Sequence, residues 1–113
     1  MAKKLRGVTS PALRESRAAL LRQLCVPPNA LRASCVRQFL TCGKLNCRCR
    51  RGHKHGPFYY LVQCLKGGAI RKFLLKTPEQ RQRVRASIAA YAQFQKQLEE
   101  LSNINTELLR RSE

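Results

Sequence analysis

Three cysteines and two histidines gather within fourteen positions of the segment TCGKLNCRCRRGHKHGPFYY, residues 41–60. The thiols are Cys42, Cys47 and Cys49, and the imidazoles of His53 and His55 follow them. Tetrahedral zinc takes four thiolate or imidazole ligands. Two cysteines two positions apart point to the same side of an extended segment, and the glycines of this segment let the chain fold back. The spacing therefore predicts a structural Cys₃His zinc site that uses the three cysteines and one histidine.

Three other uses of these thiols stay open. The gap between Cys42 and Cys47 resembles the first spacing of a plant-type [2Fe–2S] ferredoxin, but the next gap is too short. Six cysteines permit fifteen disulfide pairings. Disulfides are rare in the cytoplasm, where we expect a chain without a signal peptide to reside. Thiols can also be plain core residues, and we interpret Cys25, Cys35 and Cys64 in this way, with Cys64 as a reserve ligand.

The charge of the chain indicates its class of partner. The sequence has 23 Lys and Arg residues against 6 acidic ones, a net charge of +17. Residues 1–56 carry +12 and residues 57–77 carry +4, so the C-terminal third is nearly neutral. Such a balance favours a polyanion. The basic residues that we predict to contact nucleic acid lie in the cysteine segment, in the strand before it and at the N-terminus: Lys44, Arg48, Arg50, Arg51, Lys54, Arg37, Lys3, Lys4 and Arg6.

Aromatic residues follow the cysteine segment, and carboxylates are missing from it. Phe58, Tyr59 and Tyr60 offer rings on which unpaired bases can stack. Aromatic side chains of a small sheet more often belong to its core, so we expect Phe58 or Tyr60 to pack inside. The chain has no Asp, and no Glu between residues 16 and 78. The basic half thus offers no carboxylate base, and we expect no enzyme.

The elements that would position these residues form an α+β fold. Residues 1–9 read as a flexible basic arm, and residues 10–26 as a helix that Ser10 caps, with Pro11 at its first position. Residues 33–76 form a module of three antiparallel strands, with the zinc-binding loop between the first two. The predicted strands are 33–41, 58–65 and 69–76.

A long C-terminal helix is predicted over residues 77–111. Thr77 is its cap, Pro78 takes the first position, and Gln80 completes a capping box. Apolar residues then recur at steps of three or four, close to the coiled-coil repeat. They are Val84, Ile88, Tyr91, Phe94, Leu98, Leu101, Ile104 and Leu108. Because this stripe is longer than the small sheet, we expect part of it to pack on another helix or on a second copy of the chain.

Three motifs carry a resemblance to a known family. The motifs CGK at 42–44, NCRC at 46–49 and HGPFYYL at 55–61 resemble an uncharacterised (DUF6788-like) family of small bacterial and archaeal proteins that are often encoded near transposases. The similarity is expected over residues 33–110. It implies the hairpin and the long helix, and it favours His55 over His53 as the fourth ligand.

Two functions follow from these features. In the first, the protein is a small zinc-stabilised nucleic-acid-binding accessory or regulator, with DNA favoured over RNA. It would pair with a second copy or with a protein such as a transposase. The alternative is an interaction adaptor, whose long helix docks on a larger protein while its basic half contacts RNA.

Overall fold

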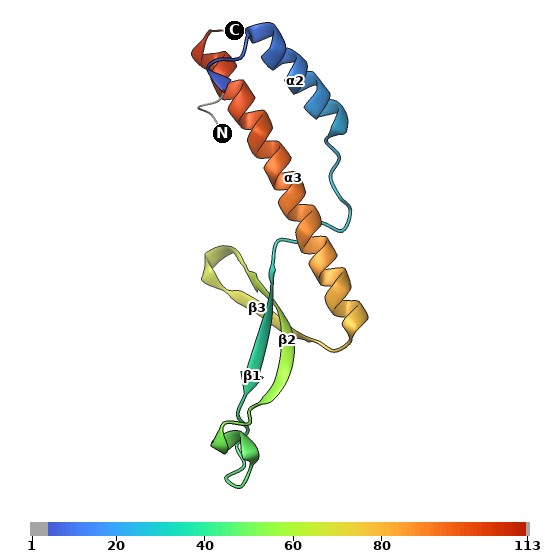
Figure 1. The fold of residues 1–113 in the computed structure, drawn as a ribbon, viewed down its shortest axis with the longest axis vertical. Coiled ribbons are helices and arrows are strands. Elements are labelled where there is room, and N and C mark those ends of the chain that lie inside the picture. Colours follow the sequence, from blue (N-terminus) through green and yellow to red (C-terminus); the bar gives the residue numbers. More distant parts are fainter. Residues whose placement is uncertain (1–4, 113) are drawn as a thin grey trace. The chain divides into compact units, whose positions relative to one another are not determined.

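The computed structural model describes residues 5–112, which form two compact units. One unit combines the chain up to Ala30 with the chain from Ala90 onward, and the other is Leu31–Ala89. The α+β prediction is confirmed (Figure 1). The elements in chain order are α2 (Ser10–Gln23), β1 (Ser34–Leu40), the 3₁₀ turn η1 (Arg48–Arg51), β2 (His55–Cys64), the 3₁₀ turn η2 (Lys66–Gly68), β3 (Ile70–Leu75) and α3 (Pro78–Arg110).

Helix α2 begins and ends slightly differently from the prediction. Its cap is Thr9, whose Oγ1 accepts a hydrogen bond from the N–H of Ala12 at 3.3 Å, and not Ser10. The two residues have equivalent hydroxyls, and the backbone selects the first of them. The helix ends at Gln23 and not at residue 26, because extended geometry is already adopted before the two following prolines.

The helical unit has a leucine-rich core. Leu13 and Leu20 of α2 are buried together with Ile104 and Leu108 of α3, and Figure 1 shows α2 beside this end of α3. Four partly buried side chains surround this core: Leu5, Val8, Leu24 and Leu101. Burying one such side chain contributes about 1.5–3 kcal/mol, so this core is a main source of stability in the helical unit. The C-terminal part of the apolar stripe therefore packs on another helix of the same chain.

A buried carboxylate holds Arg111, which links α3 to the segment before and at the start of α2. Glu107 is only 6% exposed, and Arg110 and Arg111 hold its oxygens at 2.6 and 2.7 Å. Arg111 also donates to Ser10 Oγ at 3.1 Å and to the carbonyl of Leu5 at 2.9 Å. Hydrogen bonds from Arg110, and to a smaller extent from Arg111, lower the pKa of Glu107 to about 2, because they favour the ionised carboxylate.

The second unit is built on an antiparallel sheet of order β1-β2-β3. Side chains of directly paired residues share a face. Tyr59 pairs with Arg37 and Leu75, and Leu61 lies two positions further on that face. Leu61 and Leu75 are buried there, 3% and 2% exposed. This face carries the core of the unit.

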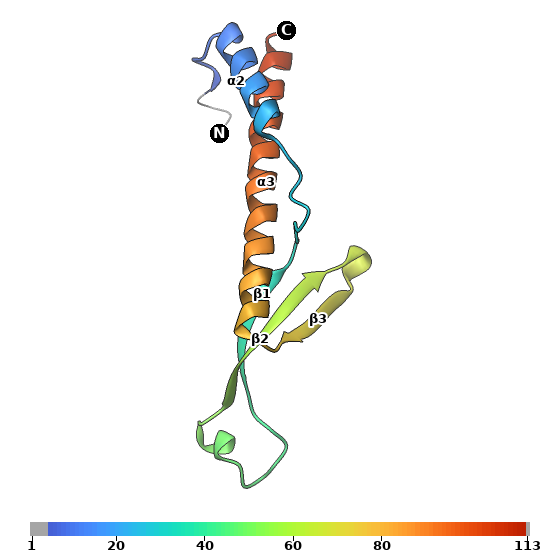
Figure 2. The same ribbon diagram turned by 90° about the vertical axis from the view of Figure 1, so that its right-hand side faces the viewer.

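The start of α3 covers the face of Tyr59. The guanidinium carbons of Arg81 and Arg85 lie 4.3 and 5.8 Å from the centroid of the Tyr59 ring. The Leu31 N–H donates to the carbonyl of Ser87 at 3.2 Å, which fixes the entry to β1. Figure 2 shows the start of α3 beside the strands.

The predicted start of α3 is confirmed. Thr77 Oγ1 accepts from the N–H of Gln80 at 3.1 Å, and Gln80 Oε1 accepts from the N–H of Lys76 at 2.8 Å. The helix reaches Arg110, one residue short of the predicted end. Leu98 remains 44% exposed, so self-association through it stays a prediction. None of the helices within residues 5–112 combines the length and apolar character that a membrane crossing requires.

Candidate metal centre and basic loop

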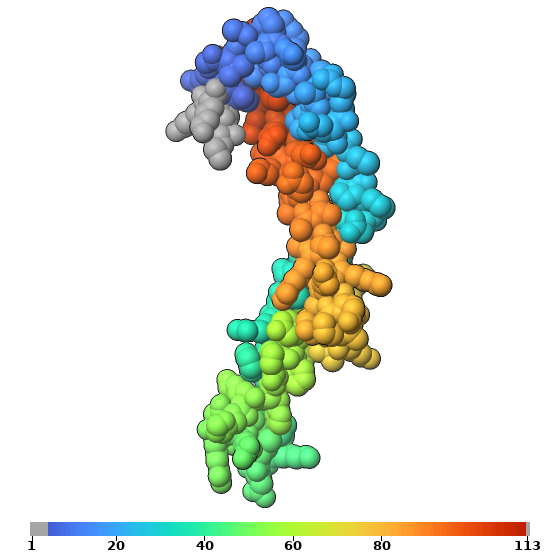
Figure 3. Space-filling model, turned by 45° about the vertical axis from the view of Figure 1, so that its right-hand side comes forward, coloured from blue at the N-terminus to red at the C-terminus, as the bar shows by residue number. Residues whose placement is uncertain are grey.

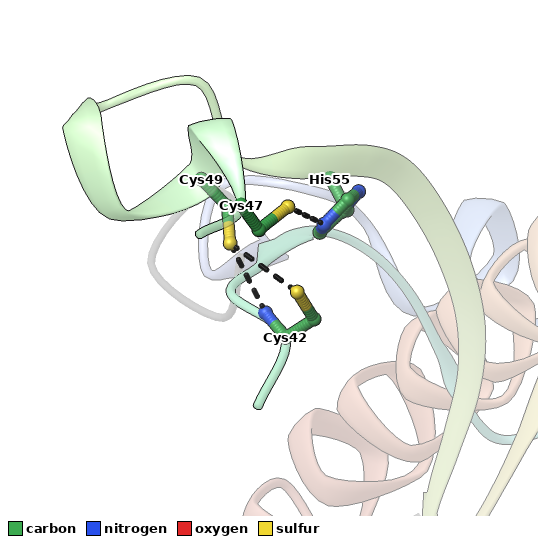
Figure 4. A group of neighbouring side chains, drawn as sticks. All are labelled: Cys42, Cys47, Cys49 and His55. Atoms are coloured by element: carbon green, nitrogen blue, oxygen red, sulfur yellow. Dashed lines mark hydrogen bonds between the residues drawn. The ribbon is translucent and has the colours of Figure 1, made fainter. Parts of the chain in front are cut away.

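The loop between β1 and β2 brings four potential metal ligands together. They are Cys42, Cys47, Cys49 and His55, and their ligand atoms all lie within 4.8 Å of one another. The Sγ atoms of Cys42 and Cys49 are 3.6 Å apart, and Sγ of Cys47 lies 3.1 Å from Nε2 of His55. Figure 4 shows the four side chains directed toward one another. This group can hold a metal ion.

The separations match those of a tetrahedral site. With metal–sulfur bonds of about 2.3 Å and a metal–nitrogen bond of about 2.0 Å, tetrahedral angles place the ligand atoms about 3.5–3.8 Å apart. The Cys42–Cys49 and Cys47–His55 pairs lie within about half an ångström of that range, and no separation exceeds it by more than about one ångström. Small side-chain rotations therefore suffice to bring all four atoms to one centre.

Local backbone turns bring the cysteines into position. The N–H of Cys47 donates to the carbonyl of Lys44 at 3.3 Å, which closes the first turn. The 3₁₀ turn η1 then carries Cys49 inward, where it is 3% exposed. Gly52 ends that turn at a φ of 98°, a left-handed conformation that favours glycine. The N–H of Cys42 donates to Sγ of Cys49 at 3.3 Å and links the start of the loop to η1.

The fourth ligand is held by the sheet. His55 is the first residue of β2 and pairs with Leu40 across a bulge in β1, so it lies in a strand that begins three residues before the predicted one. Gly56 follows at a φ of 130°, and a Cβ there would lie 2.8 Å from the carbonyl oxygen of Gln38. Only glycine allows the two strands to approach this closely, and this approach positions His55.

The thiols of the cluster are electrostatically coupled. A backbone hydrogen bond from Lys44 and then contacts with His55 and Cys47 lower the pKa of Cys42 to about 6. A backbone hydrogen bond from Cys49 lowers the pKa of Cys47. The Cys42 and Cys49 thiols and burial together outweigh this effect, so the net shift of the pKa is upward. The lowered pKa of Cys42 favours its thiolate, the form that binds metals.

The other predicted ligands lie outside this group. His53 is exposed and is not part of the cluster. Cys64, the reserve ligand, is exposed at the opposite end of β2. The prediction that Cys25, Cys35 and Cys64 are core residues was wrong for Cys25 and Cys64, which are exposed, while Cys35 is half-buried. The six cysteines are free thiols. Within residues 5–112, the loop holds the one group of three or more such ligands.

The basic side chains of the loop face solvent. Lys44, Arg48, Arg50, Arg51 and Lys54 are all exposed. In the space-filling view, side chains of the green segment that includes this loop stand out from the surface (Figure 3). They come from the same turns that position the ligands. A bound metal would therefore restrict the backbone from which these cations project.

The remaining predicted nucleic-acid contacts are distributed over both units. Arg37 is exposed on β1, with its guanidinium carbon 5.6 Å from the centroid of Phe39. Arg6 is exposed in the helical unit, and its carbonyl accepts from Arg111 at 3.2 Å. The predicted contacts Lys3 and Lys4 lie outside the described residues.

The division into units sharpens the charge pattern. The segment Leu31–Ala89 contains 14 Lys and Arg residues and one acid, Glu79, and thus holds +13 of the total charge of +17. The helical unit carries the other five glutamates. The sequence alone does not reveal the boundary between the units at Ala90, because nothing local marks that residue within one continuous helix.

A depression beside the metal ligands was also missed. It has a volume of about 360 Å³ and is lined by Leu40, Thr41, Cys42, His55 and Phe58. Leu40, one of its lining residues, ends the bulge between Gln38 and Leu40. A bulge depends on strand pairing, so alternating apolar residues alone do not reveal it.

Comparison with known proteins places the chain in a family. A family described as "Domain of unknown function (DUF6788)" matches residues 11–83. The match includes α2, the sheet, the four clustered ligands and the start of α3, so it begins earlier and ends earlier than the predicted range of 33–110. Searches of the curated proteins and of the solved structures found no match. With well over half of its length matched, the chain belongs to the DUF6788 family.

Proposed function

We propose that this protein is a small nucleic-acid-binding accessory or regulatory protein whose basic loop is held by a structural zinc ion. DNA is its first expected partner. The resemblance to proteins encoded near transposases favours a role in a mobile element. The observation that supports this function most strongly is that the potential ligands and the exposed cations occupy the same short loop.

Zinc is the metal that best suits the donor set. Three sulfur atoms and one imidazole nitrogen form one of the usual closed tetrahedral sets, whereas magnesium and calcium prefer oxygen. The cluster offers four protein ligands, which occupy all four positions of a tetrahedral zinc ion. A site without an open position favours a structural role for the metal. Free thiolates of this kind suit a reducing compartment such as the cytoplasm.

Nucleic acid is the partner that best suits the charge. A net charge of +13 on residues 31–89 strongly attracts phosphates. A loop that zinc has already ordered spares part of the entropy cost of binding. Contacts between such cations and phosphates give an affinity that decreases with salt and depends little on base sequence.

The test compares two triple variants that lose equal charge. One replaces Arg48, Arg50 and Arg51 of the loop with alanine. The matched control replaces exposed basic residues outside the loop: Arg22, Lys66 and Lys96. The loop variant should keep its zinc, lose affinity similarly for unrelated DNA sequences, and lower the salt slope by about one unit per phosphate contact. Equal losses in both variants would show that net charge, and not the loop, causes binding.

A further inference from the structure

The side chains on one face of the sheet are half-buried or exposed in the part of the chain that the structure describes. These side chains alternate with those of the Tyr59 face and come from paired positions on all three strands. They are Val36, Gln38, Phe58, Tyr60, Val62, Lys72 and Leu74. None of them is buried, whereas Leu61 and Leu75 on the opposite face are 3% and 2% exposed. We call this set the open face. Phe58 and Tyr60, one of which we expected to pack inside, are both half-buried on this face.

The open face combines aromatic rings with a cation. The Nζ atom of Lys72 lies 4.4 Å from the centroid of Tyr60 and donates to Oε1 of Gln38 at 3.0 Å. Phe58 lies two positions from Tyr60 on the same strand, about 7 Å away at about 3.4 Å per residue. Phe58 also lines the depression beside Cys42 and His55. The open face therefore continues into that depression and reaches the basic loop.

We propose that the open face binds single-stranded nucleic acid, with one base stacked on Tyr60 and a neighbouring base beside Phe58 in the depression. This inference rests on the proposed function and names the form of its ligand. Lys72 leaves the Tyr60 ring when a base arrives and contacts a phosphate instead. Its flexible side chain makes this exchange easy. The cations of the loop hold the backbone of the strand further along.

The chemistry of the face favours an unpaired strand over a duplex or a protein. Aromatic rings stack on bases only where those bases are free of a partner strand, and bases of all types have a π-face. Two rings about 7 Å apart can each receive one of two successive bases that are not stacked on each other. The surrounding unit has 14 basic residues and one acid, so a phosphate backbone is the complementary partner.

The adjacent tyrosines supply a matched pair of variants. Tyr60→Leu removes the ring from the open face and keeps an apolar side chain. Tyr59→Leu makes the same change on the covered face, beneath Arg81 and Arg85. Each variant is measured against one sequence as single-stranded DNA, single-stranded RNA and duplex DNA. Zinc content and circular dichroism verify that both variants fold.

The expected result is a loss confined to one variant and to single strands. Tyr60→Leu should weaken single-strand binding by about tenfold or more and leave duplex binding within about twofold. Tyr59→Leu should leave both unchanged. The DNA and RNA arms then show which sugar the face accepts. Equal single-strand affinity in the parent and in Tyr60→Leu would overturn the inference while leaving the loop function standing. A parent protein that binds no nucleic acid in any form would overturn the proposed function as well.

Photocross-linking supplies a readout that does not depend on affinity. Single strands that carry 5-iodouracil are irradiated with the full-length protein, and mass spectrometry locates the attached peptide. Attachment at Phe58 or Tyr60 supports the inference. Attachment confined to the helical unit contradicts it.

Discussion

Replacing Gly56 with alanine should weaken both the pairing of β1 with β2 and the binding of metal at the neighbouring centre. A Cβ at this position would lie 2.8 Å from the carbonyl oxygen of Gln38 and 3.1 Å from the backbone N of Phe58, both parts of the paired strands. The residue also has a φ of 130°. A backbone conformation of this kind costs about 1–3 kcal/mol, and overpacking costs about 1–3 kcal/mol more. We expect a loss of about 3 kcal/mol or more in the free energy of unfolding.

Zinc affinity is the most informative readout of this change. Because the site exists only when β1 and β2 are paired, its binding is coupled to folding. A loss of about 3 kcal/mol corresponds to roughly a hundredfold weaker apparent affinity. Competition with a chromophoric chelator measures this directly.

Two other glycines separate the causes. Gly67 has a φ of 85° but open space around its Cβ position, so Gly67→Ala isolates the conformational cost of about 1–3 kcal/mol. Gly43 has open space and no positive φ, so Gly43→Ala should stay within about 0.5 kcal/mol of the parent. Zinc affinity in Gly56→Ala equal to that in Gly43→Ala would refute the account of how His55 is positioned.

Three further predictions concern the helical unit. Leu108→Ala should lower the free energy of unfolding by about 2–5 kcal/mol in urea titrations, whereas Leu109→Ala, at a site 76% exposed, should change it little. Glu107 has a pKa lowered from 4.5 to about 2, so its contribution is present above pH 4.5 and disappears as the pH falls toward 2. The stability difference between the parent and Glu107→Gln should accordingly shrink over that window, and a constant difference would contradict the ion-pair explanation. The parent should self-associate, and Leu98→Glu should give a folded monomer by light scattering; a monomeric parent would rule out that seam.

Contacts between residues close in sequence made the start of α3 and the Cys₃His cluster predictable. The hydroxyl of Thr77 and the amide of Gln80 lie three residues apart, so their contacts form within one helical turn and hardly depend on the rest of the fold. The Cys₃His cluster was predictable for a similar reason, because its four ligands lie within fourteen consecutive residues. The choice of His55 rested on the family resemblance and not on spacing.

Features that depend on distant segments were not predictable. Alternation along β2 places Phe58 and Tyr60 on one face and Tyr59 on the other, but it does not indicate which face α3 covers. The contacts of Arg111 with Leu5 and Ser10 join residues about a hundred positions apart, so no local pattern predicts them.

Zinc-edge X-ray absorption on the purified, metal-loaded protein, with total metal content measured on the same sample, tests the central claim most directly. The account predicts close to one zinc per chain, with three sulfur ligands at about 2.3 Å and one nitrogen at about 2.0 Å. It also predicts that Cys49→Ser releases the metal while His53→Ala retains it. A protein that takes up no zinc, or that holds iron with visible absorbance, would contradict the account.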